Sequence, residues 1–252
     1  MDLLTITARP EIHKEKFSLL VHGFRPFFLL TSIYGSVFLS AWLAIFFEAA
    51  PNPVNIRPVI WHGHEMVFGF AFAAVCGFLL SATPTWSGGQ PIKGRQLGII
   101  VGAWIAGRAA MWLDATRHAW LVALFDLALI PALTVALWPV LTSPKSRKNL
   151  IFLIVLGAFF AANLMFHFET SALSEGTALG GLTLGVHLLA LLIVIVIGRI
   201  VPTFIAVERL ATEGPKPPLS SPALEWLAIV SVALVLASDL IDHEAAWVGL
   251  LA

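Results

Sequence analysis

The sequence predicts an all-α protein, a polytopic transmembrane helix bundle with about seven spans. Of its 252 residues, 58% are hydrophobic and only 12% are charged, whereas a soluble domain carries roughly 25% charged residues. Apolar stretches long enough to cross a bilayer recur along the chain, and basic residues concentrate in alternate connections between them. The core of a soluble domain of this length cannot bury so many apolar residues. We therefore expect an integral membrane protein that contacts the lipid bilayer.

Each predicted span is an apolar run of about 20 residues, the length at which a helix crosses ~30 Å of hydrocarbon. The spans are expected at Phe27–Phe47, His62–Ala82, Leu97–Leu113, Trp120–Leu141, Leu150–Phe168, Leu179–Val201 and Ala223–Ile241. They form one transmembrane domain, 27–252, after a charged N-terminal segment, 1–26, that lacks the apolar stretch of a secretory signal. The final apolar run, Ala245–Ala252, is too short to cross a bilayer, and we expect it to be an eighth span that is cut off.

The distribution of Lys and Arg predicts the orientation of the spans. Twelve of these residues lie in the N-terminal segment and in the second, fourth and sixth connections, while three, Arg57, Arg108 and Arg117, lie on the other side. Basic residues concentrate on the cytoplasmic side of a membrane. The N-terminus is therefore expected in the cytoplasm. Basic and acidic residues cancel at 15 each, which gives no global field that would attract nucleic acid.

Several chemical classes are excluded by missing motifs. The single cysteine, Cys76, lies in an apolar run, so an intrachain disulfide is impossible and a small apolar role is expected. The sequence contains no Walker loop, no GxSxG elbow and no HExxH motif. Catalytic residues therefore cannot be named from the sequence.

The motif Trp61–Met66 at the outer end of the second span is the densest group of ligating side chains. His62 and His64 would point about 200° apart on a helix, so both can face one site only if the helix begins at or after Gly63. Otherwise one faces the bundle and the other faces the interface. Glu65 follows His62 by three residues and could hold its second ring nitrogen, as the outer partners of metal ligands do. The alternative is that these residues cap a helix at the membrane surface.

His187 and His167 are further candidate ligands. His187 lies eight residues inside the sixth span, about 12 Å below its outer end, where a lone imidazole needs a partner such as a metal or a neighbouring helix. With that offset, His187 and the His62/His64 pair cannot share one metal, so either the second span starts deeper, with Pro53–Ile60 dipping into the bundle, or there are two sites at two depths. We expect His62 or His64 to face the bundle interior, toward the fifth or sixth span. His167 ends the fifth span one turn after Asn163, and its alternative role is that of an interfacial anchor.

Two charged residues at membrane depth also require partners. Asp126 lies about two turns into the fourth span, within plausible reach of Arg108, Arg117 or a histidine. A structural ion pair and a proton relay are both open interpretations for this carboxylate. Arg199 closes the sixth span, and its alternative role is to reach the cytoplasmic headgroups.

Four motifs in order along most of the chain closely resemble the NnrS family. They are Gly23–Phe28, Trp61–Gly69, Gly77–Leu80 with Pro84 and Trp86, and His187–Leu189 with Arg199 and Pro202. Members of this family are bacterial inner-membrane proteins that hold haem and copper and are linked to nitric oxide stress. The resemblance implies that His62, His64, Glu65, Arg25, His187 and Arg199 occupy the family's recurring polar positions, as candidates for haem or metal binding.

The leading functional hypothesis is therefore a haem- and copper-binding inner-membrane protein that acts in tolerance of nitric oxide. A second hypothesis, from another class, is a transporter or channel in which Asp126, His187 and Arg199 line a polar path. A third is a structural bundle without a cofactor, whose polar residues pair with one another. Both cofactors and the nitric oxide partner rest on the resemblance alone.

Overall fold

The computed structural model of this protein describes residues 19–212 and 221–242, and these residues fold into helices joined by turns. The helices are α1 (Phe24–Phe46), α2 (Pro58–His64), α3 (Phe72–Ser87), α4 (Arg95–Ala110), α5 (Ala115–Leu127), α6 (Leu129–Leu141), α7 (Ile151–Thr170), α8 (Thr177–Thr212) and α9 (Pro222–Asp242). Short helical turns of other types lie at η1 (Leu19–Val21), η2 (Glu65–Ala71) and η3 (Pro144–Asn149). The predicted all-α fold class is confirmed.

Two of the predicted spans are composite helices. The span predicted at 62–82 is a continuous segment in which the π-helix η2 joins α2 to α3. The span predicted at 120–141 consists of α5 and α6, which meet at Ala128. Pro131 lies in the first turn of α6 and cannot donate a backbone hydrogen bond, which accounts for a break at this point.

Five helical segments among the described residues are long and apolar enough to cross a membrane. They are Phe24–Phe46, Pro58–Ser87, Ala115–Leu141, Ile151–Thr170 and Thr177–Glu208. A shorter apolar helix covers Trp226–Asp239. The predicted span at 97–113 corresponds to α4, whose 16 residues extend only ~24 Å. The structure therefore supports a multi-pass membrane protein in which α4 is the short member.

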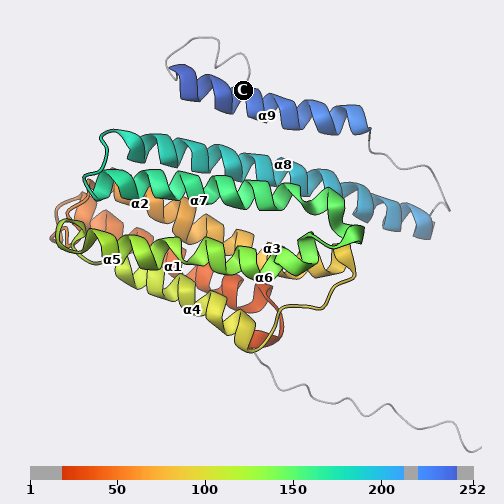
Figure 1. The fold of residues 1–252 in the computed structure, drawn as a ribbon, viewed down its shortest axis with the longest axis horizontal. Helices are drawn as coiled ribbons and strands as arrows, with labels where there is room; N and C mark the ends of the chain where they lie inside the picture. Colours follow the sequence, from red (N-terminus) through yellow and green to blue (C-terminus); the bar gives the residue numbers. More distant parts are fainter. Residues whose placement is uncertain (1–18, 213–220, 243–252) are drawn as a thin grey trace, which may run out of the picture.

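The helices lie in one bundle, with α7 and α8 side by side and α9 packed on α8 (Figure 1). The connections at 47–57, 111–114 and 171–176 share one end of this bundle. There the backbone N–H of Ala115 donates to the carbonyl of Val54 at 3.0 Å, and Arg57 lies 4.0 Å from Glu169. At the other end the backbone N–H of Gly94 donates to the carbonyl of Leu20. The connections thus alternate between ends, as the predicted spans require.

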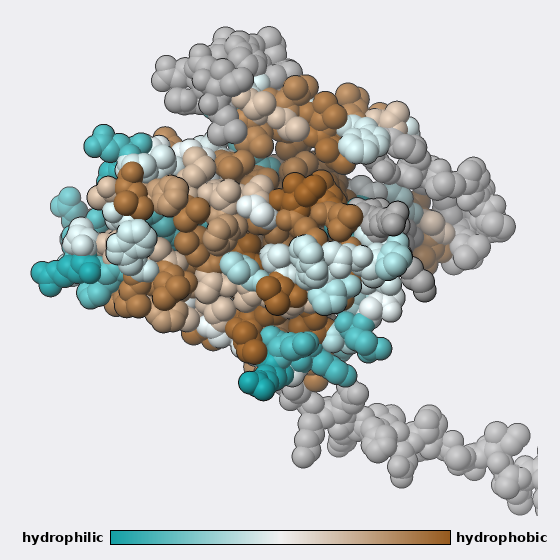
Figure 2. Space-filling model, viewed as in Figure 1, coloured by the Kyte–Doolittle hydropathy of each residue, from teal (hydrophilic) through white to brown (hydrophobic). Residues whose placement is uncertain are grey.

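Hydrophobic side chains cover much of the middle of the molecule, and hydrophilic residues gather toward its ends (Figure 2). Exposed apolar residues of the spans include Val135, Ile154 and Leu124, with exposed fractions of 73%, 68% and 66%. A soluble protein rarely exposes so continuous an apolar surface. The helices are therefore suited to contact lipid, while side chains such as the fully buried Cys76 fill the interior, as predicted.

Two sequence predictions lie beyond the described residues. Most of the N-terminal segment 1–26 precedes residue 19, and the apolar run Ala245–Ala252 follows residue 242. The division into segments 1–26 and 27–252 therefore stays a prediction.

Candidate metal centre

A cluster of buried ionisable side chains lies in the interior of the bundle. We call it the central cluster, and its members are Tyr34 on α1, His64 on α2, Glu65 on η2, Arg108 on α4, Asp126 on α5, and Asn163 and His167 on α7. The six members other than Tyr34 are all buried. Ionisable groups at membrane depth are costly unless they are paired, so such a cluster marks a functional or a tightly constrained site.

Two imidazoles and one carboxylate converge at the centre of this cluster. The Nε2 atom of His167 lies 2.8 Å from Oδ2 of Asp126, and Nε2 of His64 lies 3.2 Å from the same oxygen. One ligand atom from each of the three residues lies within 4.8 Å of the other two. Asn163 completes this side of the cluster, since its Nδ2 donates to Oδ2 of Asp126 and its Oδ1 lies 2.9 Å from Nε2 of His64.

A second layer of contacts holds these groups in place. Arg108 donates to Oδ1 of Asp126 through one guanidinium nitrogen and, at 2.5 Å, to Oε1 of Glu65 through another. Glu65 in turn faces Nδ1 of His64 at 3.0 Å and accepts from the hydroxyl of Tyr34. His64 therefore has a carboxylate partner on each side of its ring, an arrangement that fixes the orientation of an imidazole.

Local helix geometry explains how these side chains reach one another. Asn163 and His167 are four residues apart on α7 and so share one face. The wider π-helix η2 begins at Glu65, and π-helical turns occur often at functional sites. Two glycines allow close approach: a Cβ at Gly69 would lie 2.7 Å from Arg108, and one at Gly107 would lie 3.1 Å from the backbone of Asp126. Larger residues at these positions would push the arginine and the carboxylate apart.

The charge balance of the central cluster leaves one positive charge to be supplied. Glu65 and Asp126 carry two negative charges when ionised, while Arg108 carries one positive charge. Both ring nitrogens of His64 face oxygen acceptors. Because a buried charge needs compensation, either a proton on the histidines or a bound cation would complete the balance.

The two histidines of the Trp61–Met66 motif have different environments. The helix begins at Pro58, before Gly63, so the two rings diverge as expected for that arrangement. His64 faces Asn163 of α7, which agrees with the expectation that one ring turns toward the fifth span. His62 instead packs against the rings of Phe38 and Trp42, at centroid distances of 6.1 and 4.1 Å. The prediction that Glu65 holds His62 is wrong, because Glu65 faces His64, Arg108 and Tyr34.

His187 lies outside the central cluster. Its Nδ1 is 2.8 Å from the carbonyl oxygen of Thr183, and its Nε2 is 2.9 Å from Oδ2 of Asp239 on α9. These contacts give His187 its partner within α8 and α9. His187 therefore shares none of these contacts with His64, whose ring faces Glu65 and Asn163. This agrees with the expected separation between His187 and the second-span motif.

The two arginine candidates lie apart from the central cluster. Arg199 donates to Oδ1 of Asn149 at 2.5 Å and lies over the rings of Trp86 and Phe152, at 5.3 and 5.1 Å from their centroids. Arg25 is at the start of α1, where its backbone N–H donates to the carbonyl of His22. The structure therefore distributes the sequence candidates over several places. Of these candidates it brings His64, Glu65, Asp126 and His167 together.

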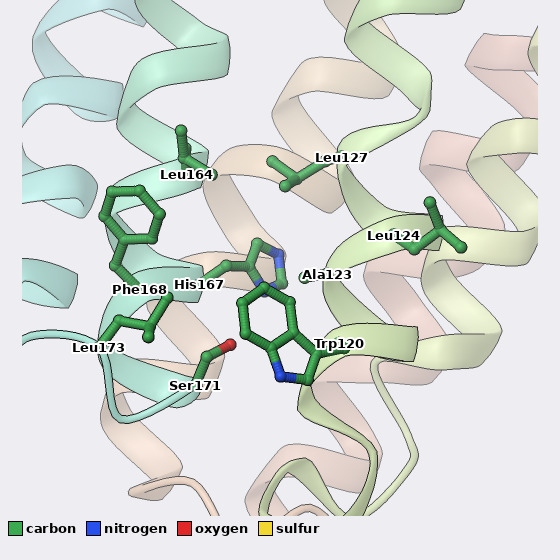
Figure 3. Close-up of a pocket in the computed structure, with 9 residues that line it drawn as sticks. All are labelled: Trp120, Ala123, Leu124, Leu127, Leu164, His167, Phe168, Ser171 and Leu173. Carbon is green, nitrogen blue, oxygen red and sulfur yellow. The ribbon is translucent and has the colours of Figure 1, made fainter.

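A cavity of about 330 Å³ lies between α5 and α7 and is lined in part by His167. Trp120 of α5 and Phe168 of α7 line it together with His167 (Figure 3). The lining residues are Trp120, Ala123, Leu124, Leu127, Leu164, His167, Phe168, Ser171 and Leu173. One side of the central cluster is thus bounded by an apolar space.

Sequence reasoning identified Asp126 as a charge in need of a partner but missed its role as the shared oxygen donor. It also missed Tyr34, which is the single tyrosine of the chain and lies in an apolar span. An isolated polar residue in a span was the available signal for both. What the sequence did not reveal was that these residues, from separate spans, meet in one place.

Comparison with known proteins gives one finding on the family. The family model described as NnrS protein matches residues 18–252. No curated protein and no solved structure matches the chain.

Proposed function

We propose, starting from the fact that this chain belongs to the NnrS family, that it binds a transition-metal ion at His64, Asp126 and His167. The proposal extends to a role in tolerance of nitric oxide, as the family resemblance implies. The observation that carries the metal site is the convergence of two imidazoles and one carboxylate within 4.8 Å in the bundle interior.

The donor set suits a first-row transition metal. Imidazole nitrogen is a common ligand of copper, iron, zinc and nickel, and two histidines with one carboxylate form a recurring iron site. Copper is the ion that the family resemblance implies, and His64, Asp126 and His167 are the residues that would hold it. A bound copper or iron ion would supply an open position to which nitric oxide can bind.

The surrounding residues of this chain would position the ligands. Arg108 holds Oδ1 of Asp126 and so leaves Oδ2 facing the two histidines. Glu65 holds Nδ1 of His64, so Nε2, which faces Asp126 and Asn163, is the nitrogen that a metal would bind. A cation would also take the place of the one positive charge that the cluster otherwise obtains from a proton.

A haem does not fit at His187 in this arrangement. Its Nε2, the nitrogen that iron would need, faces Oδ2 of Asp239 at 2.9 Å. Its Nδ1 faces the carbonyl oxygen of Thr183. Haem iron could bind this histidine only after Asp239 had moved away.

The transporter hypothesis finds less support. Asp126 contacts Arg108 and two histidines, His187 contacts Asp239, and Arg199 contacts Asn149. The three residues thus have separate neighbours. The structural hypothesis survives as a direct competitor, because the central cluster can also be completed by a proton.

Metal analysis of the purified protein separates the metal site from a purely structural cluster. We expect copper-loaded wild-type protein to retain about one ion per chain after extensive dialysis, as three protein ligands would allow. Asp126→Asn and His167→Ala should each lose it, and His118→Ala should retain it, since His118 is exposed. Thermal unfolding of the metal-free forms would identify any variant that has merely unfolded.

The proposal would be overturned if wild-type protein retained no copper after loading and dialysis. It would also be overturned if the Asp126→Asn and His167→Ala variants were folded and retained as much copper as wild-type protein.

We further propose that the N-terminus is cytoplasmic, on the basis of the asymmetry of Lys and Arg. A reporter fused after Lys148 should then be cytoplasmic, and one inserted in the 170–177 connection should be periplasmic. The opposite pattern would reverse the orientation.

A further inference from the structure

The cavity beside His167 is apolar and lies at the outer surface of the bundle. Seven of its nine lining residues are apolar, and His167 and Ser171 are the two polar ones. Trp120 and Leu124 on its rim have exposed fractions of 69% and 66%. Because these rim residues belong to the apolar surface that suits lipid, and Ser171 and Leu173 belong to the 171–176 connection, the cavity opens toward lipid near one end of the spans.

The inner wall of this cavity is the imidazole of His167. The residue is 2% exposed, and its Nε2 lies 2.8 Å from Asp126. Its Nδ1 is buried and has no hydrogen-bond partner among the described residues. Figure 3 shows this ring between α5 and α7, behind the indole of Trp120. A polar atom without a partner in an apolar space is costly, and it marks a point where a ligand could make contact.

We infer that this cavity binds a small neutral molecule that enters from the lipid, and that it excludes anions. An anion would cost far more to place there than an uncharged molecule, because no Lys or Arg lines the cavity and a single contact with Nδ1 of His167 would not compensate a full charge. Empty apolar cavities accept benzene or xenon for the same reason. The substrate that reaches the central cluster on this side would therefore be a dissolved neutral gas and not an oxyanion such as nitrite.

The claim that small neutral molecules bind here depends only on the cavity. The further claim that the cavity delivers a reacting diatomic gas to a metal rests on the proposed function. The two statements can therefore fail separately, and the experiment should report on the cavity in metal-free protein.

Xenon and iodide form a matched pair of probes, because they are isoelectronic and differ in charge. We would locate each by anomalous diffraction from crystals of the full-length, metal-free protein, grown in lipid. Xenon is expected between α5 and α7, in contact with the His167 ring, and iodide is expected to be absent from that place.

A pair of tryptophan substitutions on one helix tests whether the cavity itself holds the xenon. Leu124 lines the cavity, whereas Leu121, also exposed on α5, is absent from the lining. Leu124→Trp should remove the xenon from the cavity, and Leu121→Trp should leave it in place. Both substitutions lie on the exposed apolar surface, so they are expected to affect folding equally little.

Three results would overturn the inference. They are the absence of xenon from the wild-type cavity, the presence of iodide there, and a lipid chain that occupies the cavity and keeps xenon out. Copper analysis of the same variants keeps the two proposals apart. Xenon binding without copper retention would refute the metal site alone, and copper retention without xenon binding would refute the cavity alone.

Discussion

The central cluster and the His187–Asp239 pair are two solutions to the problem of placing ionisable groups in an apolar bundle. In the central cluster, residues from α1, α2, η2, α4, α5 and α7 surround His64 and Asp126, whose side chains are fully buried. In the pair, His187 of α8 meets Asp239 of α9, and the side chains are 14% and 20% exposed. The first is a network at the interior, and the second is a single contact near the surface of the bundle.

The difference shows that apolar sequence context is a poor guide to ligand geometry. His187 has the more apolar neighbours along the chain, where a lone imidazole is expected to need a partner. One carboxylate is nevertheless enough to provide its side-chain partner. His64 and His167 lie near the ends of their predicted spans, yet they share an oxygen of Asp126. Convergence of several donors, and not depth of one residue, distinguishes a candidate metal centre.

The largest expected effect comes from removing the positive charge of the central cluster. Arg108→Met would leave Glu65 and Asp126 buried without their guanidinium, which should destabilise the fold by about 3–5 kcal/mol. Thermal unfolding in detergent and the amount of protein in the membrane would measure this loss. Arg117→Met is the control, since Arg117 is exposed and pairs only weakly with Asp114. If the two variants were equally stable, the stability of the central cluster would not depend on buried charge pairing. The cluster would then not differ in this respect from a contact near the surface.

A smaller effect is expected from one added methyl group at the π-helix. The Cβ of Gly69→Ala would lie 2.7 Å from Nη1 of Arg108 and 3.0 Å from Oε2 of Glu65. We expect a loss of about 1–3 kcal/mol from overpacking, together with weaker copper retention as Arg108 shifts. Gly157→Ala on α7 is the matched control, because its added Cβ has nothing within 4 Å. Unchanged stability and copper in Gly69→Ala would show that the cluster is less tightly packed than its contacts indicate.

The pair between α8 and α9 should matter less. Asp239→Asn removes the charge opposite His187 and should cost about 1 kcal/mol or less, the usual size of a polar contact between membrane helices. Copper retention should be unaffected, because His187 and Asp239 share no contact with the central cluster among those described. Copper loss as large as that of Asp126→Asn would join the two regions into one functional site and remove the contrast between them.

The smallest expected effect is a pH dependence outside the spans. Asp114 caps α5 by accepting from the backbone N–H and hydroxyl of Thr116, at 2.9 and 2.6 Å. Hydrogen bonds from Thr116, and then from Asn55, lower the pKa of this carboxyl from 3.8 to about 2. The charged form is therefore favoured by folding, and its contribution is present above pH 4 and lost as pH falls toward 2. Melting curves should show wild-type protein more stable than Asp114→Asn at neutral pH.

The stability gap between wild-type protein and Asp114→Asn should narrow over that acidic interval. A gap that stays constant between about pH 4 and pH 2 would contradict a stabilising charge at this cap.

The sequence by itself determined the membrane bundle, because lipid offers no partner for an exposed backbone and so forces long apolar helices. The predicted boundaries of α7, for example, differ from the observed ones by one residue at the start and two at the end. The sequence also indicated that Asp126 needs a charged partner, since the cost of an unpaired charge at membrane depth does not depend on the fold. Arg108 and a histidine were among the partners expected.

Tertiary structure alone decided which residues form the candidate site. His167 and Asp126 are 41 positions apart, and His64 and Asn163 are 99 apart, so no helical periodicity links them. The π-helix η2 begins at Glu65, and that carboxylate faces His64 and Arg108 instead of His62. Side-chain contacts between helices depend on how the helices pack and rotate, and an apolar pattern that only requires burial does not specify that rotation.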